Sequence, residues 1–154
     1  MHLTSTPYPF LSISCHPGAT SLIQTSLPRV LTPLKDSEDF LSLEKFHTHY
    51  METLRENTEI CIRALTFIPE LSTNRPKGAM YLMLKIKFEM FFDIFDDTEF
   101  ARKLLLEENL SVLPGVCFSM SGYIRLVTCS PVIIFSDALD RLKLFCFRHN
   151  RDNQ

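Results

Sequence analysis

The chain has 154 residues, a formal net charge of −2, 45% hydrophobic residues and 22% charged residues. This length suits one domain with an appendage, and the hydrophobic content excludes a chain that is disordered throughout. The near-neutral charge gives no electrostatic reason to expect binding to nucleic acid.

The first predicted segment is an unstructured lead over residues 1–17, which is rich in proline and shows no hydrophobic period. A short helix is expected over residues 19–31, broken or kinked at Pro28. A linker follows and ends in a helix-start signal. Apolar residues at helical spacing then predict a long helix over residues 38–66, which Pro69 stops.

A strand and a capped helix are predicted next. The mostly apolar stretch over residues 79–86 predicts the strand. Asp96 or Asp97 can cap a helix over residues 98–108 that ends at Asn109. The side chains expected to face inward on this helix are Phe100, Leu104 and Leu105.

The last predicted elements are two short strands, over residues 110–113 and 123–128, and a helix that is capped by Ser136. The inward face of this helix is expected to hold Leu139, Leu142, Phe145, Cys146 and His149. The element order α, β, α, β, β, α predicts a two-layer α/β domain with about three strands, because helices and a small sheet must bury their apolar faces on each other.

The cysteines and the first residues bear on location. The five cysteines are odd in number and lack the close Cys-x-x-Cys spacing of zinc sites. They favour a reducing compartment, so we expect a cytoplasmic protein. No signal peptide is expected, since no Lys or Arg precedes the first apolar patch, and no apolar run is long enough to span a bilayer.

Arg125 is the main candidate for a site residue, because it lies in the middle of the predicted strand YIRLVT. A guanidinium stays charged, and its burial without a partner is costly. Arg125 therefore either points to solvent at a sheet edge or meets an anion. The anion-binding role would be a carboxylate clamp, since arginine presents two parallel donors.

Other patterns give no site. His47 and His49 are two positions apart on a helix and point in different directions, which is poor geometry for a shared metal ion. Gly78 and Gly115 lie in isolated turns and not in a phosphate-binding loop. We predict no catalytic, cofactor-binding or metal-binding residue.

The phenylalanine-rich stretch over residues 88–95 and its neighbouring acids also have ordinary explanations. Asp93, Asp96 and Asp97 lack the glycine and glutamate of a calcium loop, so capping and solubility explain them. The phenylalanines favour core packing, with a partner-facing patch as the alternative.

Three stretches agree in order and spacing with one known family. They are RPKGAMYLML (75–84), LLLEENLSVLPGVCF (104–118) and YIRLVTCSP (123–131). Together they resemble the C-terminal part of the tyrosine aminotransferases, which are class I/II, fold-type I enzymes dependent on pyridoxal phosphate. The segment GATSLIQTSLPRVL (18–31) resembles the part that precedes the family's small domain.

The resemblance implies a division of the chain and a role for Arg125. Residues 37–150 would form the small domain, residues 18–36 would be a helix and linker of the large domain, and residues 151–154 a tail. In the family, the arginine of the Ile-Arg-apolar strand binds the α-carboxylate of the amino acid. The resemblance therefore assigns substrate binding to Arg125.

The implied family reaction moves an amino group from an aromatic amino acid such as tyrosine to a 2-oxo acid, through pyridoxal phosphate bound to a lysine. In the family this lysine lies upstream of the part that the chain resembles, in the large domain, and the resemblance assigns its role to none of the seven lysines here. We therefore expect a fragment-like aminotransferase polypeptide that is inactive alone and does not hold the cofactor by itself. Its exposed apolar surface predicts poor solubility or a partner such as a full-length aminotransferase subunit. The alternative is a non-catalytic α/β module that binds a protein or a small carboxylate.

Overall fold

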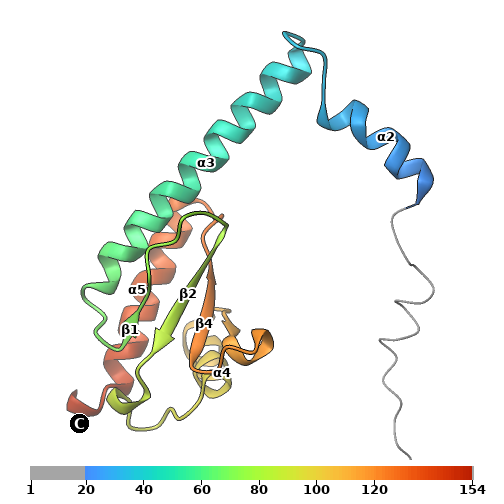
Figure 1. The fold of residues 1–154 in the computed structure, drawn as a ribbon. Helices are drawn as coiled ribbons and strands as arrows, with labels where there is room; N and C mark the ends of the chain where they lie inside the picture. The colour runs from blue at the N-terminus through green and yellow to red at the C-terminus, as the bar shows by residue number, and fades with distance from the viewer. Residues whose placement is uncertain (1–19, 154) are drawn as a thin grey trace, which may run out of the picture. The chain divides into compact units, whose positions relative to one another are not determined.

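The computed structural model describes residues 20–153, and the predicted lead over residues 1–17 lies outside the described part of the chain. The chain falls into two units, one up to Phe46 and one from His47 onward. The first unit holds α2 and the beginning of α3, and the second holds the rest of α3 and every described strand (Figure 1).

The two helices predicted in the N-terminal third are confirmed. α2 runs Ser21–Leu31, and Pro28 lies inside it without ending it. The carbonyl of Pro28 still accepts the N–H of Thr32 at 3.0 Å. α3 runs Glu38–Leu65, and the Ser37 hydroxyl accepts the N–H of Phe40 at 3.2 Å, which satisfies one free donor of the first turn.

The second unit is built on a four-stranded antiparallel sheet of order β1-β2-β4-β3. The strands are β1 Leu71–Ser72, β2 Tyr81–Ile86, β3 Leu113–Pro114 and β4 Tyr123–Val127. The prediction of about three strands missed β1, and the strand predicted over residues 110–113 overlaps β3 only at Leu113. Both strands contain two residues, so neither can show the alternation that identifies a strand.

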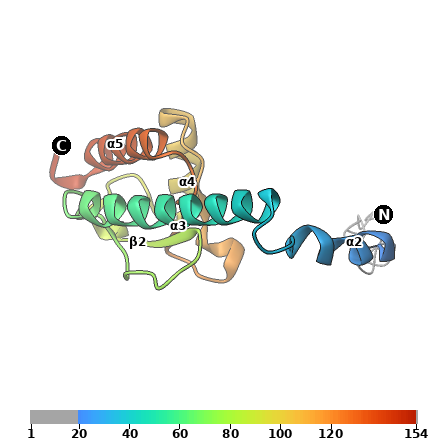
Figure 2. The ribbon, with the colours of Figure 1, turned by 90° about the horizontal axis from the view of Figure 1, so that it is seen from above.

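One face of the sheet forms the core with α3, α4 and α5, which gives the two-layer α/β fold that was predicted. α3 and α5 lie side by side in both views (Figures 1 and 2). The buried residues of the two central strands are Leu82, Leu84, Ile86, Ile124 and Leu126. The opposite face is half-exposed. Its residues on β2, β3 and β4, which we call the open sheet face, are Tyr81, Met83, Lys85, Leu113, Tyr123, Arg125 and Val127.

α4, Asp97–Glu108, has the predicted caps at both ends. The Asp96 carboxylate accepts the N–H of Glu99 at 2.7 Å, and Asn109 adopts the left-handed conformation with φ 52°. Phe100 and Leu104 are fully buried, as predicted, but Leu105 is 48% exposed. The prediction for Leu105 is wrong because only a narrow stripe of α4 packs on the core.

α5 runs Val132–His149 with Pro131 as its N-cap, five residues before the predicted cap at Ser136. The carbonyl of Pro131 accepts the N–H of Phe135 at 3.0 Å, so the Val-Ile-Ile segment forms the first helical turn. The five residues predicted to face inward are all buried. Among residues 20–153, no helix is both long and apolar enough to cross a bilayer.

Candidate functional site

Arg125 lies on the open face of a central strand. β4 pairs with β2 on one side, where Met83 opposes Arg125, and with β3 on the other, where Leu113 opposes it. Arg125 therefore does not lie at a sheet edge, although the face that carries it is half-exposed. Ile124 and Leu126 alternate with it and point into the core.

Two aromatic rings enclose the guanidinium of Arg125. Its central carbon lies 4.3 Å from the centroid of the Tyr81 ring and 4.2 Å from that of Phe118. Such stacking is favourable, because the negative face of the ring attracts the delocalised cation. We call these three residues the arginine cage. Contact with the two rings holds the cation in place, although it has no acidic partner.

The position of the Phe118 ring in the cage depends on a tight turn. Phe118 ends a short 3₁₀ helix, Gly115–Phe118, which leads toward β4. A Cβ on Gly115 would lie 2.0 Å from the carbonyl oxygen of Met120, so only glycine fits there. The buried carboxylate of Asp97 accepts the N–H of Val116 at 2.8 Å and fixes the turn to α4.

The guanidinium has free hydrogen-bonding capacity. Within the described residues, Arg125 forms no ion pair, and its buried Nε has no hydrogen-bond partner. A buried polar group without a partner usually marks a missing ligand or water. The open sheet face contains no Asp or Glu. A planar anion with two oxygens can therefore approach the guanidinium and accept two parallel hydrogen bonds.

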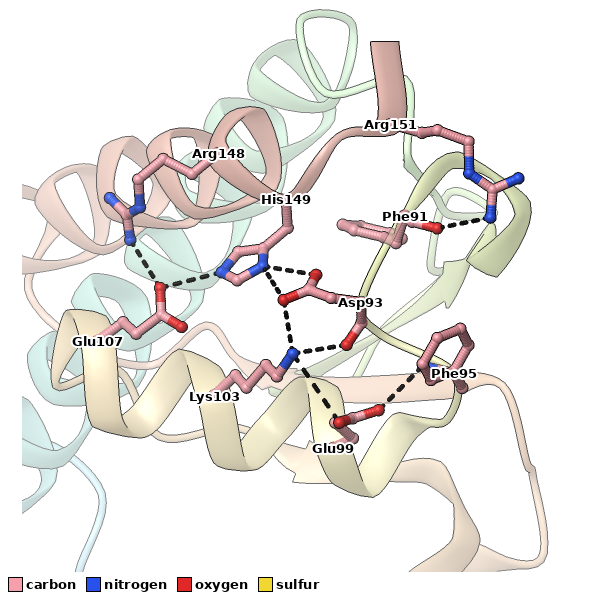
Figure 3. A network of polar contacts seen from close by, with 9 residues as sticks. All are labelled: Phe91, Asp93, Phe95, Glu99, Lys103, Glu107, Arg148, His149 and Arg151. Atoms are coloured by element: carbon pink, nitrogen blue, oxygen red, sulfur yellow. Dashed lines mark hydrogen bonds and ion pairs between the residues drawn. The ribbon is translucent and has the colours of Figure 1, made fainter. Parts of the chain in front are cut away.

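A second polar cluster links α4, α5 and the segment between β2 and α4 (Figure 3). The two ring nitrogens of His149 lie 2.8 Å from Asp93 Oδ1 and 3.0 Å from Glu107 Oε2. Lys103 Nζ lies 2.6 Å from Asp93 Oδ2, and Arg148 contacts Glu107 at 3.2 Å. We call this the His149 network.

The charges of the His149 network shift its carboxyl groups. Burial raises the pKa of Asp93, but the hydrogen bonds and positive charges of Lys103 and His149 outweigh burial and hold that pKa below its ordinary value. Burial also raises the pKa of Glu107, and the hydrogen bonds from His149 and Arg148 again bring it below the ordinary value. The network therefore stabilises the fold through ionised carboxylates.

The sequence did not predict this network. Asp93 was assigned to capping or solubility, whereas its carboxylate meets Lys103 and His149. Asp96 is a helix cap as predicted, and Asp97 is buried. The partners come from three separate segments, so no local spacing in the sequence could identify them. The phenylalanine-rich stretch is divided, with Phe91 fully buried and Phe95 70% exposed.

No metal site accompanies the cage. Among residues 20–153, no group of three or more His, Cys, Asp or Glu side chains is placed to hold a metal ion. The four cysteines within the described residues, Cys61, Cys117, Cys129 and Cys146, are free thiols. Burial raises the pKa of Cys61 to about 12, so that thiol is unreactive in the folded chain.

The arginine cage and four of the described lysines, which are Lys85, Lys87, Lys103 and Lys143, do not fit pyridoxal phosphate. Lys103 is engaged by Asp93, Lys87 donates to a backbone carbonyl at 2.6 Å, and Lys143 lies over an aromatic ring. Lys85 shares the open sheet face with Arg125, but that face carries no carboxylate that could bind the pyridine nitrogen of the cofactor. We therefore assign no cofactor-dependent step to these residues.

Comparisons with known proteins agree with the resemblance seen in the sequence. The model for aminotransferases of class I and II matches residues 17–132. Tyrosine aminotransferase of Mus musculus is 34% identical over 134 residues, which are 86% of this chain and 27% of that protein. Cystine lyase CORI3 of Arabidopsis thaliana is 33% identical over 144 residues, which are 92% of this chain and 31% of that protein.

A solved structure confirms the fold. Tyrosine aminotransferase from Leishmania infantum superposes with a TM-score of 0.71 at 34% identity, covering 87% of this chain and 31% of that chain. The chain thus spans less than a third of the length of these relatives, 27% to 31%. From the matched family model, the relatives and the fold, we conclude that the chain belongs to the class I and II aminotransferase family.

Proposed function

We propose that this chain supplies the carboxylate-binding arm of a tyrosine aminotransferase-like catalytic unit, and that Arg125 contacts the α-carboxylate of the substrate. The observation that carries the proposal is the arginine cage, in which a guanidinium without an ionic partner is held between Tyr81 and Phe118. Because the rings of Tyr81 and Phe118 both lie against the guanidinium, its N–H groups are the part that a ligand can hydrogen-bond. A carboxylate matches those N–H groups with two parallel hydrogen bonds.

The substrate would be an aromatic amino acid such as tyrosine, with a 2-oxo acid as the amino-group acceptor. The names of the similar tyrosine aminotransferases support this choice. The similar cystine lyase has another activity in its name, so the α-carboxylate common to all amino acids is the part of the substrate that Arg125 recognises. The residues of this chain would bind and orient that group and keep water from it.

Amino-group transfer by this chain alone is not expected. The arginine cage lacks a lysine and an acid suited to the cofactor, and the family reaction depends on a lysine that forms an imine with pyridoxal phosphate. Incubation of the purified chain with pyridoxal phosphate and borohydride should give no stoichiometric labelling at any one lysine. Capture of one cofactor per chain at a single position would refute this part of the proposal.

Carboxylate binding tests the role of Arg125 directly. We expect 2-oxoglutarate and tyrosine to shift the Arg125 Nε–H signal in NMR titrations. Arg125→Gln should weaken binding about 10- to 100-fold, since a hydrogen bond to a charged group contributes about 1.5 to 3 kcal/mol. The affinity of Arg125→Lys for 2-oxoglutarate should lie between that of the wild type and that of Arg125→Gln, because lysine keeps the charge but loses the paired donors.

The matched control for this titration is Arg102→Gln, which removes an exposed arginine of α4 that forms no ion pair within the described residues. Binding by this variant should equal that of the wild type. If Arg125→Gln and Arg102→Gln bind 2-oxoglutarate equally well, Arg125 does not bind the carboxylate.

A second candidate function is a non-catalytic module that binds a full-length aminotransferase subunit. The open sheet face favours it, since Tyr81, Leu113 and Val127 are each about 40% exposed and apolar. Size-exclusion chromatography of this chain mixed with a full-length tyrosine aminotransferase would detect the complex. Leu113→Asp should abolish the complex, and an unchanged elution profile for the mixture would exclude this candidate.

The division of the chain and its location are part of the same proposal. Residues 37–150 would form the small domain, and residues 18–36 would belong with the large domain of a complete enzyme. A protein that starts at residue 37 should then melt at the temperature of the whole chain. The described free thiols favour a reducing compartment, so we propose the cytoplasm, which cell fractionation would test.

A further inference from the structure

A groove separates α3 from the loop that leads into β2. Its volume is about 500 Å³, within the range of about 300 to 1,000 Å³ that is usual for small-molecule sites. One wall is formed by α3 from Tyr50 to Glu59 and the other by the loop from Arg75 to Met80. No residue of the arginine cage lines it, so the groove is a separate feature of the chain.

The walls of the groove are largely apolar. Leu54 and Met51 project from α3, and Pro76, Ala79 and Met80 from the loop. The Tyr50 hydroxyl lies 3.8 Å from the Met80 sulfur, so the two walls meet at that point. Methionine side chains are flexible and polarizable, and they adapt to ligands of irregular shape.

The charges around the groove are mainly positive. Arg55, Arg75 and Lys77 line it together with one acid, Glu59. Arg75 forms an ion pair with Glu59, which leaves two cations. Within the described residues neither Arg55 nor Lys77 forms an ion pair. The groove therefore combines an apolar body with two available positive charges, and this complements an anion that carries an apolar group.

The loop is held in the shape that forms the groove. Ala79 has a φ of 72°, in the left-handed region that costs a non-glycine residue about 1 kcal/mol or more. The N–H of Thr128 donates to the carbonyl of Met80 at 2.9 Å and ties the loop to the end of β4. Strained backbone held by its surroundings is frequent at ligand sites. The wall is thus formed before any ligand arrives.

We propose that this groove binds a small organic carboxylate with an aromatic or aliphatic body. The body packs between Leu54 and Met80, and the carboxylate lies near Arg55 and Lys77. This site is distinct from the arginine cage, where recognition is confined to the carboxylate itself. The proposal depends on neither the catalytic role of Arg125 nor the proposed aminotransferase function.

The probes that test the proposal are 4-phenylbutyrate and 4-phenylbutan-1-ol, which differ in the charged end alone. The methyl groups of Met51 and Met80 report on the groove in ¹H–¹³C NMR spectra, and that of Met90 reports on a position that does not line it. The titration is repeated in Arg125→Gln, so that binding at the arginine cage does not contribute. We expect saturable shifts at Met51 and Met80 with 4-phenylbutyrate, and binding of the alcohol at least tenfold weaker.

The double variant Arg55→Gln, Lys77→Gln should lose at least tenfold in affinity for 4-phenylbutyrate. Both side chains are exposed, so the fold should be retained. The matched control is Lys45→Gln with Arg63→Gln, which removes two exposed cations of the same helix outside the groove. Equal binding of the acid and the alcohol, equal affinity of the two double variants, or shifts at Met90 as large as those at Met80 would each overturn the proposal.

Discussion

Replacement of Asn57 by alanine should destabilise the second unit strongly. Asn57 is fully buried on α3, and its amide nitrogen donates to the carbonyl of Thr128 at 2.8 Å and to that of Ser130 at 2.7 Å. These two bonds tie the helix to the segment that leaves β4, the strand of Arg125. Loss of the side chain removes both bonds at once.

The cost follows from the environment of the two carbonyls. Thr128 is buried, so its unsatisfied carbonyl costs about 1 to 3 kcal/mol. Ser130 is half-buried, so its carbonyl can form a hydrogen bond with water instead, and the lost bond costs about 1 kcal/mol. The expected decrease in the free energy of unfolding is about 2 to 4 kcal/mol, with a decrease in Tm of roughly 10 °C.

Urea denaturation followed by far-UV circular dichroism measures this loss. Asn74→Ala, at an exposed position, is the matched control and should change the free energy of unfolding by less than about 0.5 kcal/mol. Asn57→Asp keeps the size of the side chain but replaces the donor by an acceptor, so it should be at least as destabilising as Asn57→Ala. The reasoning is wrong if Asn57→Ala costs no more than Asn74→Ala, or if Asn57→Asp is clearly the milder change.

Four further outcomes test the structure. Gly115→Ala should lower the free energy of unfolding, measured by urea denaturation, by about 3 kcal/mol because its Cβ clashes with the Met120 carbonyl. Gly78→Ala should be nearly neutral because the space around Gly78 is open, and equal effects of the two variants would contradict the turn geometry. The folded pKa of Asp93 lies below its unfolded value, so its stabilisation is present above about pH 5 and is lost as the pH falls below about 4. Asp93→Asn should therefore flatten the decline of stability in acid, whereas Asp140→Asn, at an exposed position, should leave that decline unchanged, and identical slopes would argue against the His149 network. Phe118→Leu should weaken 2-oxoglutarate binding about 3- to 10-fold in the NMR titration through loss of cation–π stacking, and wild-type affinity would count against the cage. Iodoacetamide at pH 8 should alkylate Cys117 and Cys129 in the folded chain, whereas Cys61 and Cys146 should react only after the chain is unfolded. Alkylation of Cys61 in the folded chain would show that it is not buried.

Elements with a long repeat or a clear cap could be predicted from the sequence. The apolar stripe of α3 and the Asp96 and Asn109 caps of α4 are local signals, because the residues that define them lie within a few positions of one another. β1 could not be predicted, since Leu71–Ser72 is a strand through its pairing with β2 and not through its own pattern. Val132–Ile134 are β-branched and favour strands, so the start of α5 was placed too late.

The site was predictable in part. Alternation in YIRLVT placed Arg125 on the face opposite Ile124, and the structure agrees. The two rings of the cage were not predicted, because Tyr81 reaches Arg125 through the register of β2 against β4 and Phe118 through the turn at Gly115. Both depend on tertiary packing, which a hydrophobic period does not report.

The pairing of β2 with β4 has a consequence for folding. These strands are neighbours in the sheet, but α4, β3 and the 3₁₀ turn separate them in the chain. A long loop must therefore close before the central pair forms, which slows the search for the native topology. During synthesis, β2 leaves the ribosome before β4, and its apolar face stays uncovered until β4 follows. In that interval the exposed face of β2 is a surface to which a chaperone would bind.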